Sequence, residues 1–310
     1  MCLSIVRKTG LLALLVISAL TGKAQFFQHY SHYHMNGFII NPAYAGSRDV
    51  MSAVFLHRDQ WIGFPGAPVT QTLSMHSPLK NINSAVGINI FNDKISVSRH
   101  TGIFFDYAYR FKTGKNSRLS LGLSAGISFF RSALGEIQTT TGNDQAFDGT
   151  NFKYTTPNFG FGMFYTGKRF FAGLSWPLMV KYASDLSNNI PDSLMVSPIN
   201  RFLQAGYIFK LNDDLDIKTT IMIRNYEQFE GQLDLTAGLI VYKTLLIGFA
   251  IRSKDAFTGL IEFQVNDKFR IGYAHDFVTS GLAKYTHGSN EIVLRYEPVF
   301  KTAFSNTRFF

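Results

Sequence analysis

The chain has 310 residues, of which 46% are apolar and 15% aromatic but only 16% charged. This composition excludes an intrinsically disordered protein, because disorder requires few aromatic residues and a high charge. The formal net charge is +9, but Lys and Arg form no basic run in the sequence, so nothing indicates nucleic-acid binding.

Residues 1–24 are predicted to be a secretory signal peptide. A basic start precedes an apolar run over 11–20, and the segment ends in a small residue, Ala24. The apolar run is too short to cross a bilayer as a helix. Cleavage near Ala24 would remove the single cysteine, Cys2, so we expect the exported chain to hold no disulfide, zinc–thiolate site or cysteine nucleophile.

From about residue 51 onward, apolar residues recur with a period of two, which is the period of a β-strand. The clearest block is 119–129, where Leu, Ala, Ile and Phe alternate with Ser and Gly. Blocks of this kind predict fourteen strands: 51–58, 69–77, 84–92, 102–111, 119–129, 158–166, 169–177, 201–211, 214–225, 232–242, 244–253, 256–265, 268–277 and 289–300.

An even number of strands about ten residues long, each with an apolar face and a polar or small face, is typical of an outer-membrane barrel. The alternative is a large soluble β-sandwich or lipid-binding protein, but its sheets would usually turn a charged or polar face to water. We therefore predict an all-β fold, a transmembrane antiparallel β-barrel of the outer membrane with about 14 strands over 51–300. Residues 25–50 would form an N-terminal segment leading into the barrel, and 301–310 a C-terminal tail.

The lengths of the connections support this strand count. If both termini lie on the periplasmic side, short periplasmic turns alternate with longer outer loops. The long connections, such as 130–157 and 178–200, all fall in the outer set, whereas the periplasmic set is brief. The alternation would break if one strand in the middle were missed.

The faces opposite the apolar ones would point into the lumen. A pore that selects ions usually lines itself with one sign of charge, whereas a balanced set can form ion pairs across strands or with a plug. We therefore hypothesise a lumen that is closed or occupied at rest. The predicted lumen residues are balanced: Arg110, Lys210, Lys218, Arg224, Arg252, Arg270 and Arg295 with Asp106, Asp216, Asp234, Glu262, Asp276, Glu291 and Glu297.

Many of the predicted periplasmic turns are basic. Their cations suggest either docking to an acidic periplasmic partner or contact with inner-leaflet phosphates. The turn residues concerned are Lys112, Lys115, Arg118, Lys168, Arg169, Lys243 and Lys268.

Histidines raise the question of metal binding or catalysis. His29, His32 and His34 lie close together in the sequence, but without a carboxylate or cysteine beside them we favour aromatic packing near the membrane interface over a metal site. His275 and Asp276 could belong to a hydrolase, but no GxSxG or HExxH motif accompanies them. We expect no enzyme and no cofactor.

Two segments are not explained by strand alternation: NPAYAGSRD at 41–49 and HRDQWIGFPGAPVTQTLSMHSPL at 57–79. They closely resemble the opening of the PorP/SprF family of Bacteroidetes outer-membrane proteins, which shows N-P-A-x-A-G, R-x-Q-W and G-A-P-x-T elements. Weaker matches follow along the mature chain, although a G-S-H-E-I string of that family is GSNEI here, with Asn290 in place of the histidine. The motif positions are Asn41, Pro42, Ala43, Ala45, Gly46, Arg58, Gln60, Trp61, Gly66, Ala67, Pro68 and Thr70.

The resemblance implies a barrel that works with the type IX secretion system as an accessory or anchor. Its implied partners are a secreted adhesin-like protein with a C-terminal sorting domain, periplasmic secretion-system components and outer-membrane lipid. Gliding motility is implied for some members, and catalysis is not. A solute channel or transporter of the outer membrane is the alternative.

The motif also has a physical interpretation. Asn41 and Pro42 end any helix and start a turn, and Gly46 permits a tight bend. Trp61 and the stretch 63–68 would lie in the first outer loop, where a stiff segment exposes an aromatic side chain to a partner at low ordering cost. The alternative, which we leave open, is that this loop caps the barrel mouth with Arg58 and Gln60 satisfied internally.

Overall fold

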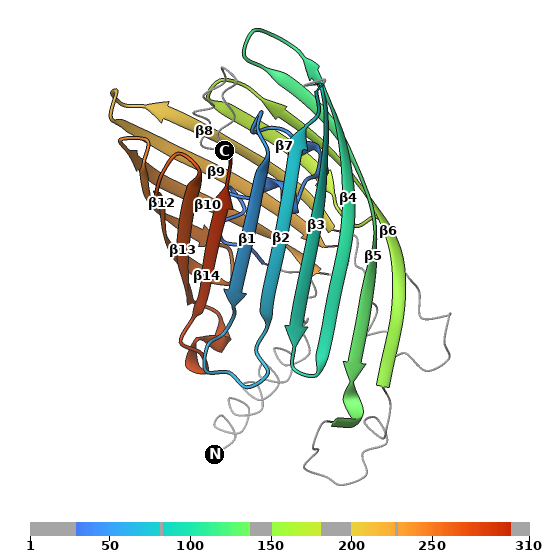
Figure 1. Ribbon diagram of the computed structural model, residues 1–310. Helices are drawn as coiled ribbons and strands as arrows, with labels where there is room; N and C mark the ends of the chain where they lie inside the picture. Colours follow the sequence, from blue (N-terminus) through green and yellow to red (C-terminus); the bar gives the residue numbers. More distant parts are fainter. Residues whose placement is uncertain (1–28, 81–82, 137–150, 181–199, 227–228, 299–310) are drawn as a thin grey trace, which may run out of the picture.

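The computed structural model describes residues 29–80, 83–136, 151–180, 200–226 and 229–298; the predicted signal peptide and the tail 301–310 lie outside them. Fourteen antiparallel strands form a closed barrel in which β1 pairs with β14 (Figure 1). Among the described residues, no helix is both long and apolar enough to cross a membrane.

The strands are β1 (Ser52–Asp59), β2 (Val69–Pro78), β3 (Ser84–Ile95), β4 (Ser98–Lys112), β5 (Arg118–Ala133), β6 (Asn151–Thr166), β7 (Phe170–Trp176), β8 (Asn200–Lys210), β9 (Leu215–Tyr226), β10 (Phe229–Val241), β11 (Leu245–Arg252), β12 (Ala256–Gln264), β13 (Phe269–Val278) and β14 (Ser289–Tyr296). Short 3₁₀ helices are η1 (Gly37–Ile39), η2 (Pro42–Tyr44), η3 (Leu134–Glu136) and η6 (Gly281–Lys284).

The predicted all-β barrel and its fourteen strands are confirmed, and the main errors lie at the outer end. The predicted loop over 93–101 shrinks to a tight turn at 96–97, and β5 and β6 extend into the predicted loop 130–157. The hydrophobic pattern fades there because these strand ends leave the lipid, yet the backbone ladder continues. In contrast, β14 ends before the predicted residue 300, and Pro298 lacks the N–H that a ladder requires.

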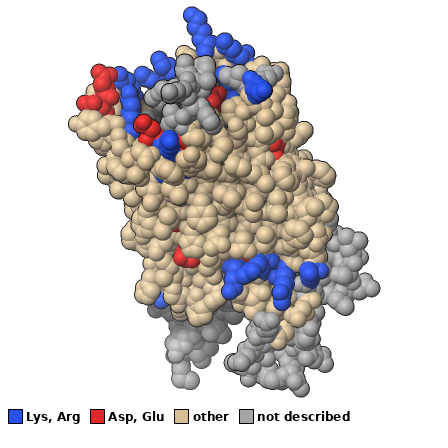
Figure 2. Space-filling view, viewed as in Figure 1, with Lys and Arg blue, Asp and Glu red and all other residues tan. Residues whose placement is uncertain are grey.

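Side chains alternate between lipid and lumen as the strand period requires. On β4, Phe105 is 64% exposed on the outer face, whereas its neighbours Phe104 and Asp106 are each 5% exposed and point inward. Figure 2 shows the result as a broad belt without charged side chains, with Lys, Arg, Asp and Glu gathered toward the two ends. This belt is the surface that meets the hydrocarbon of the membrane.

The N-terminal segment 29–51 lies inside the barrel. Every residue from 29 to 48 is buried except the half-buried Ile39. We call 29–48 the plug. We call the end of the barrel with the short turns, where Ser52 and Tyr296 also lie, the periplasmic end, and the other the outer end. The plug begins among residues near the outer end and reaches the periplasmic end at Arg48, from where the chain enters β1.

The turn η2 packs against β4, β5 and β6, and glycines in the wall make room for it. A Cβ added to Gly122 would lie 2.2 Å from the backbone nitrogen of Ala43, and one added to Gly162 would lie 2.1 Å from Oδ1 of Asn41. Phe38 and Tyr44 of the plug join wall residues in one buried apolar cluster. The wall is therefore shaped to hold the backbone of the plug.

We predict that Gly122→Ala destabilises the barrel by about 1–3 kcal/mol, because the new methyl group must displace the plug backbone or distort the wall. The measurement is the midpoint temperature of unfolding in detergent, which is monitored by the shift in gel migration of heated samples. Gly259→Ala is the matched control, since nothing lies within 4 Å of a Cβ added there. Equal midpoints for the two variants would contradict this packing.

Candidate functional site

Arg58 anchors the plug at the seam where the barrel closes. It lies on β1 directly opposite Glu291 of β14 and is 1% exposed. Its Nη2 donates to Oδ2 of Asp276 on β13 at 2.5 Å, and its Nη1 donates to Oε2 of Glu291 at 3.2 Å and to Oγ of Ser31 at 3.0 Å. One guanidinium therefore joins three strands and the plug.

The charge network continues away from the seam around the lumen wall. Arg252 of β11 lies 3.3 Å from Asp276 and 3.4 Å from Asp234 of β10. Asp234 also forms an ion pair with Arg224 of β9, whose Nη1 is 2.7 Å from Nδ1 of His29. Because buried ions must be paired to offset their desolvation, this alternation of cations and anions holds its members in one arrangement.

The three plug histidines bind three different partners. His29 meets Arg224, the ring Nδ1 of His32 lies 2.9 Å from Glu291, and Nε2 of His34 lies 2.8 Å from Glu262. The expected position near the membrane interface is wrong, because the rings lie inside the lumen, where carboxylates from distant strands meet them. Aromatic packing is present, since the ring of His34 contacts the rings of His32 and Tyr33. Among the described residues, no group of three or more His, Cys, Asp or Glu side chains could hold a metal ion.

A second group of ion pairs fixes the periplasmic end of the plug. Arg48 donates to both carboxylate oxygens of Glu297, at 2.7 and 3.0 Å. The neighbouring Asp49 forms ion pairs with Arg110 and Arg118. Burial alone would raise the pKa of Glu297, but the nearby guanidinium groups hold that pKa well below its usual range, so the carboxylate is ionised and paired.

The motif residues of the plug act through its backbone. Asn41 caps η2, since its Oδ1 accepts a hydrogen bond from the N–H of Ala43 at 3.0 Å, and its Nδ2 donates to the carbonyl oxygen of Met163 at 3.1 Å. Pro42 is the first residue of η2, and Ala45 is fully buried. Gly46 has a φ of +71°, and a Cβ there would lie 2.6 Å from the side chain of Ala85. A larger residue would strain this bend.

The remaining motif residues follow β1 around the outer rim. Thr70 is buried and its hydroxyl donates to Asp93 at 2.5 Å, whereas Gln60 donates its backbone N–H to Pro68. Trp61 is half-buried, so the exposed aromatic residue of this loop is Phe64, at 41% exposure. The loop therefore lies at the outer rim with Phe64 rather than Trp61 exposed, while Arg58 is satisfied inside the lumen.

Hydrogen bonds tie this rim loop to its neighbours. The N–H of Ile62 donates to the carbonyl of Gly288 at 2.8 Å, and the N–H of His287 donates back to Ile62 at 2.8 Å. On the other side, the N–H of Ser96 donates to the carbonyl of Gly66 at 2.9 Å. We call the loops 60–68, 96–97 and 279–288 the outer rim, and these bonds make it one braced surface.

The prediction of the lumen residues is largely correct, with two errors and two omissions, the buried residues Arg58 and Asp93. Lys210 is exposed at the periplasmic end and pairs with Asp213, and Asp216 is only half-buried, because β8 and β9 meet there in a turn. Arg58 was not predicted to face the lumen. Its nearest inward neighbours on β1, Val54 and Leu56, are apolar because they pack against the plug, and they hid the polar pattern.

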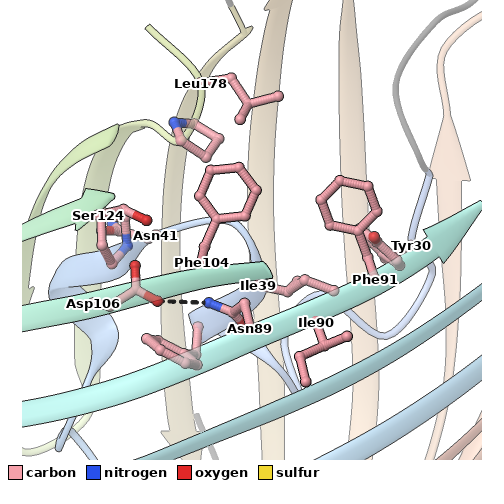
Figure 3. A pocket seen from close by; sticks show the side chains of 13 residues that line it. Tyr30, Ile39, Asn41, Asn89, Ile90, Phe91, Phe104, Asp106, Ser124 and Leu178 are labelled. Atoms are coloured by element: carbon pink, nitrogen blue, oxygen red, sulfur yellow. Dashed lines mark hydrogen bonds between the residues drawn. The ribbon is translucent and has the colours of Figure 1, made fainter. Parts of the chain in front are cut away.

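A cavity of about 50 Å³ remains between the plug and β3, β4 and β5 (Figure 3). Phe91, Phe104 and Leu178 give it apolar walls, and Nδ2 of Asn89 donates to Oδ2 of Asp106 at 3.0 Å across it. A space of this size holds a few water molecules and no more.

His275 and Asp276 do not form a catalytic pair. Adjacent residues of a strand point to opposite faces. Asp276 lies in the lumen with Arg58, whereas Nδ1 of His275 lies 2.7 Å from Oδ1 of Asn290 on β14. Asn290 thus has a hydrogen-bonding role.

We predict that Arg58→Ala lowers the free energy of unfolding by about 3–5 kcal/mol, because it strips a buried cation from two carboxylates. Unfolding in urea or by heat in detergent measures this loss, and limited proteolysis reports release of the plug. Lys210→Ala is the control: its pair with Asp213 is exposed, so it should cost less than about 1 kcal/mol. A similar small loss in both variants would contradict the anchoring role of Arg58.

Comparisons with known proteins agree with this architecture. Residues 22–296 match the family model of the type IX secretion system membrane protein PorP/SprF. No curated protein matches the chain.

Several solved outer-membrane barrels are similar in fold. A TodX monoaromatic hydrocarbon channel with the deltaS2 mutation is 10% identical, covers 86% of this chain and 94% of its own, and has a TM-score of 0.52. The CymD monoaromatic hydrocarbon channel is 11% identical, the match covers 87% of this chain and 94% of that one, and the TM-score is 0.50. The outer membrane protein Omp33 of Acinetobacter baumannii is 9% identical, the match covers 80% of this chain and 98% of that one, and the TM-score is 0.45.

At such low identity the similarity to TodX and CymD concerns the fold alone. The closed fourteen-stranded barrel with its uncharged outer belt is an outer-membrane protein. The match to the family model covers most of the sequence, including both N-terminal motif segments. The chain belongs to the PorP/SprF family of type IX secretion system membrane proteins.

Proposed function

We propose that this protein is an accessory or anchor in type IX protein secretion, for the export or surface attachment of large adhesin-like proteins. The observation that carries this proposal is the occupied lumen: residues 29–48 are buried inside the barrel. Hydrogen bonds of Ser31 with Arg58 and Asp276 hold the plug at its outer end, and the ion pair between Arg48 and Glu297 holds it at the periplasmic end. A barrel filled in this way acts through its outer surfaces rather than through a pore.

The outer rim is the surface we assign to the secreted partner. It exposes Phe64 at 41% and Tyr285 at 67%, and Ile95 at the adjoining end of β3 is 41% exposed. The hydrogen bonds between Ile62, Gly288 and their neighbours already order these loops, which reduces the entropy that binding must offset. Gln60, Trp61, Gly66 and Pro68 would then act by shaping the rim.

The basic turns at the opposite end are the surface we assign to periplasmic secretion components. Lys112, Lys115, Lys168 and Lys243 are exposed there, so an acidic partner would meet an unobstructed positive surface. In this proposal the barrel connects a partner outside the cell with one in the periplasm. If the exported protein is an adhesin used for gliding, this protein would also be required for gliding motility.

A solute channel is the second candidate, because the solved barrels TodX and CymD carry the name of hydrocarbon channels. This function would require the plug to leave or to rearrange. Removing it would break the contacts of Ser31, His34 and Arg48 with the wall together.

We predict that the purified protein gives no large, steady conductance in planar lipid bilayers. The plug blocks ion flow, and the variant Asp276→Asn/Glu291→Gln, which weakens its contacts at Ser31 and His32, should show intermittent current. Asp213→Asn, in an exposed turn, is the control and should stay silent. Steady current through the unaltered protein would favour the solute channel.

We predict that cells lacking this protein lose one or a few large surface proteins that share a C-terminal domain, while outer-membrane integrity is unchanged. Quantitative proteomics of the cell surface and the medium measures this loss. Restoring the protein with Phe64→Ser/Tyr285→Ser should rescue export only in part, because the rim has lost its apolar contacts.

The matched control for the rim is Phe105→Ala, which removes an exposed aromatic from the lipid belt instead. It should restore export fully. An unchanged set of exported proteins in the cells without this protein would sink the secretion role. Full restoration of export by the rim variant would contradict only the docking role of the rim.

A further inference from the structure

Four basic residues form a row on the outside of the barrel near its outer end. Lys94 of β3 lies opposite Arg99 of β4, Arg99 lies opposite Arg131 of β5, and Arg131 lies opposite Lys153 of β6. All four side chains are exposed. Figure 2 shows basic side chains gathered low on this face, over the strands that Figure 1 labels β3 to β6. We call these four residues the basic row.

The basic row places like charges directly against one another. Residues opposite each other on neighbouring strands have Cβ atoms only about 5 Å apart, so like charges there destabilise the sheet. In the described part of the chain no carboxylate forms an ion pair with any of the four, and Asp93 and Asp106, the acidic residues of β3 and β4, are buried on the inward face. Four exposed cations side by side are suited to bind an anion from outside the protein.

The position of the row indicates which anion it meets. On each strand, the next residue that faces outward lies closer to the middle of the barrel. These residues form a level of mixed polarity that includes Asn92, Thr101 and Phe129. The next step brings an apolar level with Ile103 and Ile127. The row thus stands just beyond the apolar belt, at the depth of the lipid headgroups of the outer leaflet.

We propose that the basic row binds the phosphate groups of a phosphorylated glycolipid of the outer leaflet. The acyl chains of this lipid would lie on the apolar level with Ile103 and Ile127, closer to the middle of the membrane. Guanidinium groups grip phosphate oxygens with two parallel hydrogen bonds, which suits Arg99 and Arg131 at the centre of the row. Three strand spacings make the row roughly 14 Å long, enough for two phosphates of one lipid.

A lipid fits this site better than an acidic protein. The row lies on the side wall of the barrel and not on the rim loops, and beyond one mixed level the surface becomes apolar toward the middle of the barrel. A glycolipid offers both anionic and apolar parts at these heights. The basic row would then fix the depth and rotation of the barrel in the membrane.

The test is native mass spectrometry of the purified, folded protein with bisphosphorylated lipid A as the probe. We expect one lipid to bind the unaltered protein, and the variant Lys94→Gln/Arg99→Gln/Arg131→Gln/Lys153→Gln to bind at least tenfold more weakly. Monophosphorylated lipid A should bind at an intermediate level. Inorganic phosphate at millimolar concentration should not displace the lipid.

The matched control neutralises four cations at the periplasmic end, Lys112→Gln/Lys115→Gln/Lys168→Gln/Arg169→Gln, and should bind lipid A like the unaltered protein. Shifts in gel migration on heating verify that both variants are folded. Equal binding by both variants would overturn the proposal. Displacement by inorganic phosphate would show an ion site instead, and unchanged lipid binding with loss of an acidic co-purifying protein would show a protein site, so either would also overturn it.

Discussion

The contact between Arg58 and the carboxylates of Asp276 and Glu291 is the interaction on which the rest of the structure depends. It lies across the pairing of β1 with β14, which closes the barrel, and it also reaches Ser31 of the plug. An unpaired carboxylate buried at this position would be costly. Closure of the barrel and seating of the plug are therefore coupled by one buried set of charges.

This coupling explains why the two N-terminal motif segments have different roles, one inside the barrel and one at its seam and outer rim. Asn41 and Gly46 fit the plug into hollows that glycines leave in the wall, while Arg58 anchors the start of the plug from the facing strand. Two residues after Arg58 the same chain becomes the braced rim loop, beginning at Gln60. The motif thus links the interior of the barrel to its outer surface over a few residues.

The outside of the barrel shows a complementary division of charge. On the face that Figure 2 shows, the middle of the barrel carries a broad belt without charged side chains. The periplasmic turns are basic, and a separate basic row lies near the outer end. Charges inside the lumen can be satisfied by one another because they alternate in sign. Charges outside, all of one sign in the basic row, depend on what surrounds the protein.

The sequence by itself determined the barrel, its strand number and most residues of the lumen, because lipid on one face and a polar interior on the other impose a period of two. It also indicated that the lumen is occupied, since the inward charges balance. Strand ends beyond the lipid were misplaced because the hydrophobic pattern stops before the backbone ladder does.

Only the tertiary structure decided what fills the lumen and how it is held. The carboxylates that meet His32 and His34 lie more than two hundred residues away in sequence, and the inward neighbours of Arg58 on its own strand, Val54 and Leu56, are apolar. The basic row was equally hidden, because its four members lie on four strands and become neighbours only through register. Contacts between distant segments leave no local pattern, so the fold had to bring them together before they could be recognised.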